Sequence, residues 1–227
     1  MQHLVQPSMV PLVVPQRPLY RIVKRLLDIA VAATALVALT PVFAACALAV
    51  RRGSPGPIIF RQERVGLRGR TFTFLKFRSM YHNADAAPHR DYVTAFIRGE
   101  AAQVADGDRQ VYKLVGDARI TPTGRWLRRT SLDELPQFWS VLRGDMSLVG
   151  PRPPIPYEVE QYGPDQLARL AVKPGITGLW QISGRSSTTF DQMVALDLNY
   201  IRQQSFWFDL VILVRTIPAV LSTRGAR

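Results

Sequence analysis

The stretch IAVAATALVALTPVFAACALAV, residues 29–50, decides the architecture of this chain. None of its 22 residues is charged, and at about 1.5 Å per residue a straight helix of this length reaches across a bilayer core of roughly 30 Å. Pro41, directly after Thr40, removes one helical hydrogen bond and crowds the carbonyl group four residues back, so it kinks a helix. Each half is then about 15–18 Å long, close to half of the hydrocarbon thickness. We therefore expect a broken, re-entrant membrane helix that has its helix break at Thr40 and Pro41.

Basic residues flank this stretch on both sides, so both ends favour the cytoplasmic side of a membrane. They are Arg21, Lys24, Arg25, Arg51 and Arg52. Three other interpretations stay open: a single-pass helix that tolerates its proline, a cleaved signal peptide, and a buried core helix. The apolar run is long for a signal peptide, and it lacks the polar stripe of a soluble helix.

The composition indicates a folded protein from a reducing compartment that has an anionic partner. Apolar residues make up 47% of the 227 residues and charged residues 20%, so the chain can bury a core. A single cysteine rules out a disulfide framework. The net charge of +12 points to nucleic acid, lipid headgroups or a phosphorylated substrate.

Two strand-like runs follow the apolar stretch, IIFRQERV (58–65) and RTFTFLKFRSM (70–80), joined through glycines. On a strand, Lys76 and Arg78 share one face about 7 Å apart. Two cations at this spacing can hold a diphosphate. The alternative is a solvated edge strand that is protected by its charge.

Residues 82–118 are interpreted as helical. His82 and His89 lack metal-ligand spacing, and we expect both to be solvated. The sequence contains no histidine–cysteine metal motif, no P-loop and no GxGxxG.

The stretch GRWLRRTSLDELPQFWSVLRGDMSLVGPRPP, residues 124–154, concentrates the chemistry-bearing side chains. Asp133 and Glu134 are expected at a helix N-terminus, where Ser131 and Glu134 fit a capping box. Arginines surround the pair: Arg125, Arg128, Arg129 and Arg152. Adjacent carboxylates among arginines suit phosphoryl transfer, because one acid can attack phosphorus while its neighbour helps bind a divalent cation. The alternative is that both acids simply cap the helix and pair with arginines.

Two later stretches leave their interpretation open. KPGITGLWQISGR, residues 173–185, is either a backbone-lined binding loop that ends in Arg185 or a structural turn with a packed tryptophan. SFWFDLVILVRTIPAVL, residues 205–221, is too short to span a membrane and suits an interfacial or a core helix.

Together these motifs closely resemble the bacterial sugar transferase family, the monotopic phosphoglycosyl transferases that begin polysaccharide and glycoconjugate assembly. The resemblance runs from about Tyr20 to the C-terminus. The motifs that carry it are KRLLDI, PGPIIFRQERVG, FLKFRSM, RRTSLDELPQFWSVLRGDMSLVGPRP and KPGITGLWQISGR. In one place the chain departs from the family, because Thr40 replaces the serine of the usual helix-breaking Ser–Pro pair.

The resemblance implies a two-step reaction in which Asp133 is the nucleophile and Glu134 its partner, both close to a Mg²⁺ cofactor. The aspartate takes the phosphosugar from a UDP-sugar, UMP leaves, and a polyprenyl (undecaprenyl) phosphate then accepts the phosphosugar. Substrate binding is assigned to basic residues: Lys76, Arg78, Arg128, Arg152 and Arg185. The form of the glycine loop is similar to the branch that moves glucose-1-phosphate or galactose-1-phosphate into exopolysaccharide or lipopolysaccharide O-antigen.

The expected fold class is α+β. It combines the re-entrant helix with a small, mostly helical catalytic domain that has a short β-hairpin and interfacial amphipathic helices. The expected organisation is a lead-in at 1–19, the membrane helix at 20–52, and a domain at 53–227 on the cytoplasmic face of the bacterial inner membrane. The expected partners are the two substrates and the membrane, with a homodimer as a further option and no nucleic acid. The alternative function is a catalytically inactive basic module that binds acidic lipid or a polysaccharide-assembly partner.

Overall fold

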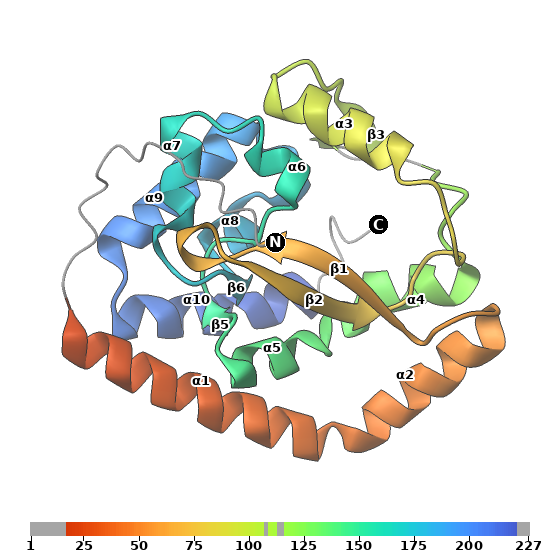
Figure 1. Ribbon diagram of the computed structural model, residues 1–227, viewed down its shortest axis with the longest axis horizontal. Helices are drawn as coiled ribbons and strands as arrows, with labels where there is room; N and C mark the ends of the chain where they lie inside the picture. The colour runs from red at the N-terminus through yellow and green to blue at the C-terminus, as the bar shows by residue number, and fades with distance from the viewer. Residues whose placement is uncertain (1–16, 107–108, 113–115, 222–227) are drawn as a thin grey trace.

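The computed structural model describes residues 17–106, 109–112 and 116–221. Helix α1 (Pro18–Ala38) and helix α2 (Thr40–Gly53) run along one side of the molecule (Figure 1) and are bent by 62° relative to each other. Within the described ranges no single helix is long and apolar enough to cross a membrane, but the bent pair meets that test by length and composition. The predicted broken helix is confirmed, and it begins two residues before the expected Tyr20.

The bend has a local cause in the Thr40–Pro41 pair. Proline has no amide hydrogen, so Pro41 cannot donate to the carbonyl group four residues back. The Thr40 hydroxyl donates to the Leu36 carbonyl at 3.0 Å. This bond gives a partner to one carbonyl group beside the bend.

Strands β1 (Ile59–Val65) and β2 (Thr71–Phe77) form an antiparallel hairpin, as the alternating sequence predicts. The register pairs Phe60 with Lys76. The connecting turn uses Gly69 at φ 76°, a left-handed conformation that glycine adopts without strain. The hairpin therefore presents Lys76 near the end of its second strand.

The region 82–118 is only partly helical, so that prediction was wrong beyond its first half. Helix α3 (Ala87–Ile97) is followed by the short antiparallel strands β3 (Val104–Asp106) and β4 (Arg109–Val111). The two strands pair in the register Val104 with Val111 and Ala105 with Gln110, so these residues are extended and not helical. His82 is exposed as expected, but His89 is partly buried and lies 2.7 Å from the Tyr157 hydroxyl.

Helix α4 (Pro122–Thr130) and helix α5 (Gln137–Arg143) enclose a single 3₁₀ turn, Leu132–Glu134. The expected capping box is absent, because Ser131 ends α4 at φ 56° and its side chain makes no capping bond. Helix α5 begins at Gln137, and Pro136 is its N-cap. The two acidic residues thus lie in the turn before the helix.

Strands β5 (Ser147–Val149) and β6 (Gly175–Thr177) form a parallel pair in which glycines allow the backbones to touch. A Cβ atom on Gly175 would lie 2.1 Å from the Gly150 nitrogen, and one on Gly150 would lie 2.4 Å from the Lys173 oxygen. The glycines of this loop are therefore required for backbone packing, which is the structural alternative of the sequence analysis. The remaining helices are α6 (Pro156–Val159), α7 (Pro164–Leu167), α8 (Leu179–Ser183), α9 (Phe190–Gln203) and α10 (Phe206–Leu221).

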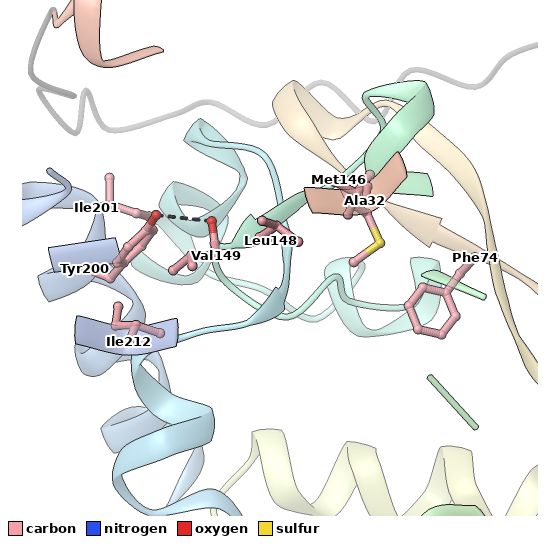
Figure 2. Close-up of a cluster of buried hydrophobic side chains, with 9 residues drawn as sticks. Ala32, Phe74, Met146, Leu148, Val149, Tyr200, Ile201 and Ile212 are labelled. Carbon is pink, nitrogen blue, oxygen red and sulfur yellow. Dashed lines mark hydrogen bonds between the residues drawn. The ribbon is translucent and has the colours of Figure 1, made fainter. Parts of the chain in front are cut away.

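One buried cluster joins α1, the hairpin, β5 and the two C-terminal helices (Figure 2). Its members are Ala32, Phe74, Val141, Met146, Leu148, Val149, Tyr200, Ile201 and Ile212. Helix α10 has two characters, because Ile212 is fully buried whereas Trp207 and Ile217 are exposed. The core-helix interpretation of the last stretch therefore applies to one side of α10, and the interfacial interpretation stays a prediction for the exposed side.

Polar contacts fasten α1 to the rest of the molecule. Asp28 is only 3% exposed, and its Oδ1 accepts hydrogen bonds from the Leu148 amide at 2.9 Å and the Ser147 hydroxyl at 3.1 Å. Arg25 donates to two carbonyl groups at the C-terminal end of α5, at 2.6 and 2.8 Å. Helix α1 is thus attached both to β5 and to the helix that follows the acidic pair.

Candidate active site

Asp133 and Glu134 are adjacent but held in different ways. Asp133 is 7% exposed, and its carboxylate accepts no hydrogen bond from the described residues. The Glu134 Oε1 accepts a hydrogen bond from Arg152 Nη1 at 3.2 Å. Glu134 is therefore fixed by an ion pair, while the Asp133 oxygens keep lone pairs available for attack or metal coordination.

Three cationic side chains act on the Asp133 carboxylate from three separate elements. Lys76 comes from β2, Arg128 from α4, and Arg152 from the segment after β5. Arg128 is oriented by its Nε, which donates to the Ser79 hydroxyl at 2.8 Å. The structure thus brings three predicted cations to the two predicted acids, an arrangement that can neutralise a diphosphate.

The proline-rich segment 151–154, which carries Arg152, is held through all four of its carbonyl groups. In chain order the donors are the Gly175 amide at 2.9 Å, Arg169 Nη2 at 3.5 Å, Arg64 Nη1 at 2.8 Å and the Val65 amide at 2.9 Å. Its three prolines have no amide hydrogen, so the segment cannot build its own hydrogen-bonded turn. Arg152 is therefore positioned by residues distant in the sequence.

Two of those donors are buried arginines that the sequence analysis did not single out. Arg169 is 3% exposed and forms an ion pair with Asp197 at 2.8 Å. Arg64 is 7% exposed, and burial lowers the pKa of its guanidinium to about 10. A buried charge is retained only with good partners, and these two are used to fix the Arg152 segment.

The binding roles predicted for two further residues, Arg78 and Arg185, stay untested. Strand β2 ends at Phe77, and Arg78 Nη2 donates to the Ser54 carbonyl at 2.6 Å and to its hydroxyl at 3.0 Å, beside the end of α2. Arg78 and Lys76 line the same cavity, and a diphosphate site that uses both stays a prediction. Arg185 begins a 3₁₀ turn, but its side chain lies outside the described part of the structure.

A cavity of about 1610 Å³ opens onto the acidic pair and the three cations. Its wall includes Lys76, Arg128, Asp133, Glu134 and Arg152. Pockets for one drug-sized ligand are typically about 300–1,000 Å³, so this cavity has room for a larger substrate or for two. Its wall also includes aromatic residues of α3 and its neighbours.

The sequence profile of the family described as bacterial sugar transferase matches residues 19–223. The chain belongs to this family. Among curated relatives, galactosyl transferase CpsE of Streptococcus agalactiae is 45% identical over 207 residues, which are 91% of this chain and 44% of that protein. Exopolysaccharide production protein ExoY of Sinorhizobium fredii is 41% identical over 210 residues, 92% of this chain and 90% of ExoY.

A third relative in the bacterial sugar transferase family carries a fuller name. The UDP-glucose:undecaprenyl-phosphate glucose-1-phosphate transferase of Caulobacter vibrioides is 40% identical over 224 residues, 93% of this chain and 76% of that protein. The chain spans less than half the length of CpsE but nearly all of ExoY. The shared region contains the acidic pair and its three cations.

The cavity environment shifts the pKa values of two of these groups into the neutral range. Burial and the neighbouring Glu134 raise the pKa of Asp133 to about 6, although Lys76, Arg128 and Arg152 oppose the shift. Burial and the nearby Arg128 lower the pKa of Lys76 to about 8. Near neutral pH Asp133 is thus mainly a carboxylate and Lys76 mainly an ammonium group.

The sequence did not indicate the groups that hold or neighbour the cations without bonding to the acids. These groups are Arg64, Arg169, Ser79 and the His89–Tyr157 pair. An arginine on the inward-facing side of a predicted strand, as at Arg64, is the one signal that marks such a residue from sequence. Arg169 and Asp197 are 28 residues apart and carry no common motif.

We expect Arg64→Met to weaken the binding of inorganic pyrophosphate by about tenfold or more, because a shift of Arg152 by about 1 Å is costly at such sites. Isothermal titration calorimetry measures the dissociation constant on the detergent-solubilised chain. Arg70→Met is the charge-matched control, since Arg70 is exposed at the start of the same strand pair. If both variants weaken pyrophosphate binding equally, Arg64 contributes only its charge and does not position Arg152.

Proposed function

We propose that this protein transfers a hexose-1-phosphate from UDP-glucose or UDP-galactose to undecaprenyl phosphate and releases UMP. The names of the relatives refer to galactosyl transfer, exopolysaccharide production and glucose-1-phosphate transfer to undecaprenyl phosphate. The single observation that carries the proposal is the buried, unpaired Asp133 carboxylate among three cations. The product would be the first lipid-linked intermediate of exopolysaccharide or O-antigen synthesis.

In the first step, an Asp133 oxygen attacks the sugar-bearing phosphorus of the donor. The bond between that phosphorus and the bridging oxygen breaks, and UMP departs with the bond electrons. Lys76, Arg128 and Arg152 offset the negative charge on the transferring group and on the leaving phosphate. Burial favours this attack, because a carboxylate with few hydrogen-bond donors is a stronger nucleophile than a solvated one.

In the second step, a phosphate oxygen of the polyprenyl phosphate attacks the same phosphorus. The bond from phosphorus to Asp133 breaks, and the carboxylate is regenerated. Both steps use the same cations, so one site serves a soluble donor and a lipid acceptor in turn. The size of the cavity is compatible with this use.

Asp133 and Glu134 fit a Mg²⁺ ion as the expected cofactor. The described residues contain no cluster of three or more His, Cys, Asp or Glu, so the chain offers these two adjacent carboxylates and no complete cage. Mg²⁺ typically uses one or two carboxylates, waters and substrate phosphates. When bound, the ion would supply further charge neutralisation on the diphosphate.

We further propose that the α1–α2 pair dips into the cytoplasmic leaflet of the inner membrane and returns. Exposed apolar side chains on α1, α2 and α10 support this placement: Leu19, Ile22, Leu26, Val37, Leu48, Trp207, Val214 and Ile217. A membrane would bury these side chains, and a cluster of exposed apolar side chains marks an interaction site. The site would then lie where a soluble donor and a lipid acceptor can both reach it.

We expect Asp133→Asn to abolish UMP release, because an amide cannot act as the nucleophile, whereas Asp165→Asn at an exposed position leaves it intact. The purified chain is incubated with Mg²⁺, polyprenyl phosphate and each of UDP-glucose, UDP-galactose and their N-acetyl counterparts. Mass spectrometry of the quenched native chain, without acceptor, should detect a phosphohexose adduct on Asp133. Substantial UMP release by Asp133→Asn would exclude the covalent route, and none from the native chain would favour the inactive membrane-attached module.

The pH profile of kcat/KM should be bell-shaped. Activity is lost as the pH falls below about 6, because Asp133 then takes up a proton, and as the pH rises above about 8, because Lys76 then loses its charge. Lys76→Arg should remove the alkaline limb and leave the acidic limb, since a guanidinium stays protonated. An unchanged alkaline limb in this variant would show that Lys76 is not the titrating group.

Cysteine labelling tests the membrane placement. The only cysteine, Cys46, is buried and is replaced by alanine. Leu19→Cys and Arg52→Cys should both react with an impermeant maleimide from the cytoplasmic side only, and Val37→Cys near the bend should be shielded by lipid. Labelling of the first two from opposite sides would favour a single-pass helix.

A further inference from the structure

Helix α3 presents one face to the cavity. Its cavity-lining residues are His89, Tyr92, Val93, Phe96 and Ile97, which follow the i, i+3, i+4, i+7, i+8 spacing of a single helical stripe. No residue of α3 is fully buried. An apolar stripe that lines a cavity and is left incompletely covered is suited to contact a ligand.

Contacts with neighbouring helices hold α3 in place. His89 Nδ1 lies 2.7 Å from the Tyr157 hydroxyl, and Gln161 donates to the Thr94 hydroxyl at 3.1 Å. The Phe96 ring packs edge-on against Phe190, with centroids 5.8 Å apart. The helix is therefore fixed to α6 and α9 at the rim of the cavity.

Polarity changes along the face from cationic to aromatic. His89 lies at the cationic end, where burial and then Arg64 and Lys76 lower the pKa of its imidazole to about 4. Tyr92 lies one turn further on, stacked on Phe96 at 6.2 Å with an interplanar angle of 7°. Phe96 in turn contacts Tyr112 at 5.5 Å. We define the aromatic face as Tyr92, Phe96 and Tyr112.

The aromatic face lies far from the helices proposed to enter the membrane. Helix α3 occupies the side of the molecule opposite α1 and α2 (Figure 1). The acidic pair directly precedes α5, which packs against α1. A lipid tail would extend from the acidic pair toward α1 and α2, so the ligand that reaches α3 is the water-soluble one.

We propose that the aromatic face is the nucleobase subsite, where the uracil ring of the UDP-sugar stacks on Tyr92, supported by Phe96 and Tyr112. This inference rests on the proposed function. A UDP-sugar has an anionic diphosphate at one end of its nucleotide and a planar ring at the other, the same order as the cations and aromatic rings along the cavity. Every nucleobase has a π-face, and stacking on aromatic side chains is a common way to hold one.

His89 lies between the two ends of the subsite. With its pKa far below 7 the imidazole is neutral, so it can donate or accept a hydrogen bond without repelling the adjacent cations. Its Nδ1 is engaged with Tyr157, and Nε2 has no hydrogen bond to the described residues. Nε2 is therefore available to the ribose or to the base edge.

Direct binding of UMP to the full chain in detergent micelles tests this subsite without turnover. Tyr92→Leu should raise the dissociation constant of UMP by about tenfold or more. The same variant should change the dissociation constant of inorganic pyrophosphate by less than about twofold. Tyr92→Phe, which keeps the ring, should retain UMP binding. Asp91→Leu, an exposed position on the same helix and absent from the cavity wall, is the control for a leucine substitution in α3.

Other outcomes would overturn the subsite. If Tyr92→Leu leaves UMP binding unchanged but raises KM for UDP-glucose, the aromatic face holds the hexose. If Tyr92→Leu weakens the binding of UMP and of pyrophosphate equally, α3 only shapes the cationic end of the cavity. Tyr92-dependent binding of UMP by a native chain that releases no UMP from any UDP-sugar would support the subsite and refute the proposed function, so the two failures are distinguishable.

Discussion

One buried carboxylate ties the apolar N-terminal pair to the reactive part of the molecule. Asp28 accepts hydrogen bonds from Leu148 and Ser147 of β5. Strand β5 leads directly into the proline-rich segment that carries Arg152, and Arg152 pairs with Glu134. Loss of this acceptor would leave the buried Leu148 amide unpaired and lower the free energy of unfolding by about 1–3 kcal/mol. The position of the acidic pair relative to α1 therefore depends on this link as well as on the contacts of α1 with α5.

The site balances two opposing electrostatic effects. Burial disfavours a charged Asp133, whereas the cations on three elements favour it, and the result is a carboxyl group that titrates near neutrality. Burial, and after it repulsion from Arg128, lowers the pKa of Lys76. Such mutual repulsion without a bound anion is typical of a site built for a polyanion, because substrate phosphates relieve it. The charges are thus better accommodated with a diphosphate present than without one.

Local features of the fold were predictable from the sequence, and long-range features were not. The bend at Pro41 and the β1–β2 hairpin follow from backbone chemistry within a few residues. The motif around Asp133 indicated the reactive acids, and the structure gathers Lys76, Arg128 and Arg152 around them.

The errors have physical causes of two kinds. The helix expected at the acidic pair begins only at Gln137, with Pro136 as its N-cap. The contacts of His89 with Tyr157 and of Arg169 with Asp197 join residues 68 and 28 positions apart. No periodicity or spacing rule marks such pairs, since each depends on how distant elements pack.

The segment 151–154 also constrains the order of assembly. Its carbonyl groups take donors from β1, from the turn that contains Arg169, and from β6, and its prolines supply none. It can adopt its final shape only after regions up to 89 residues distant in sequence have come together. A nascent or partly unfolded chain therefore lacks the Arg152 arrangement, and the surroundings of the acidic pair are complete only once these distant regions have folded together.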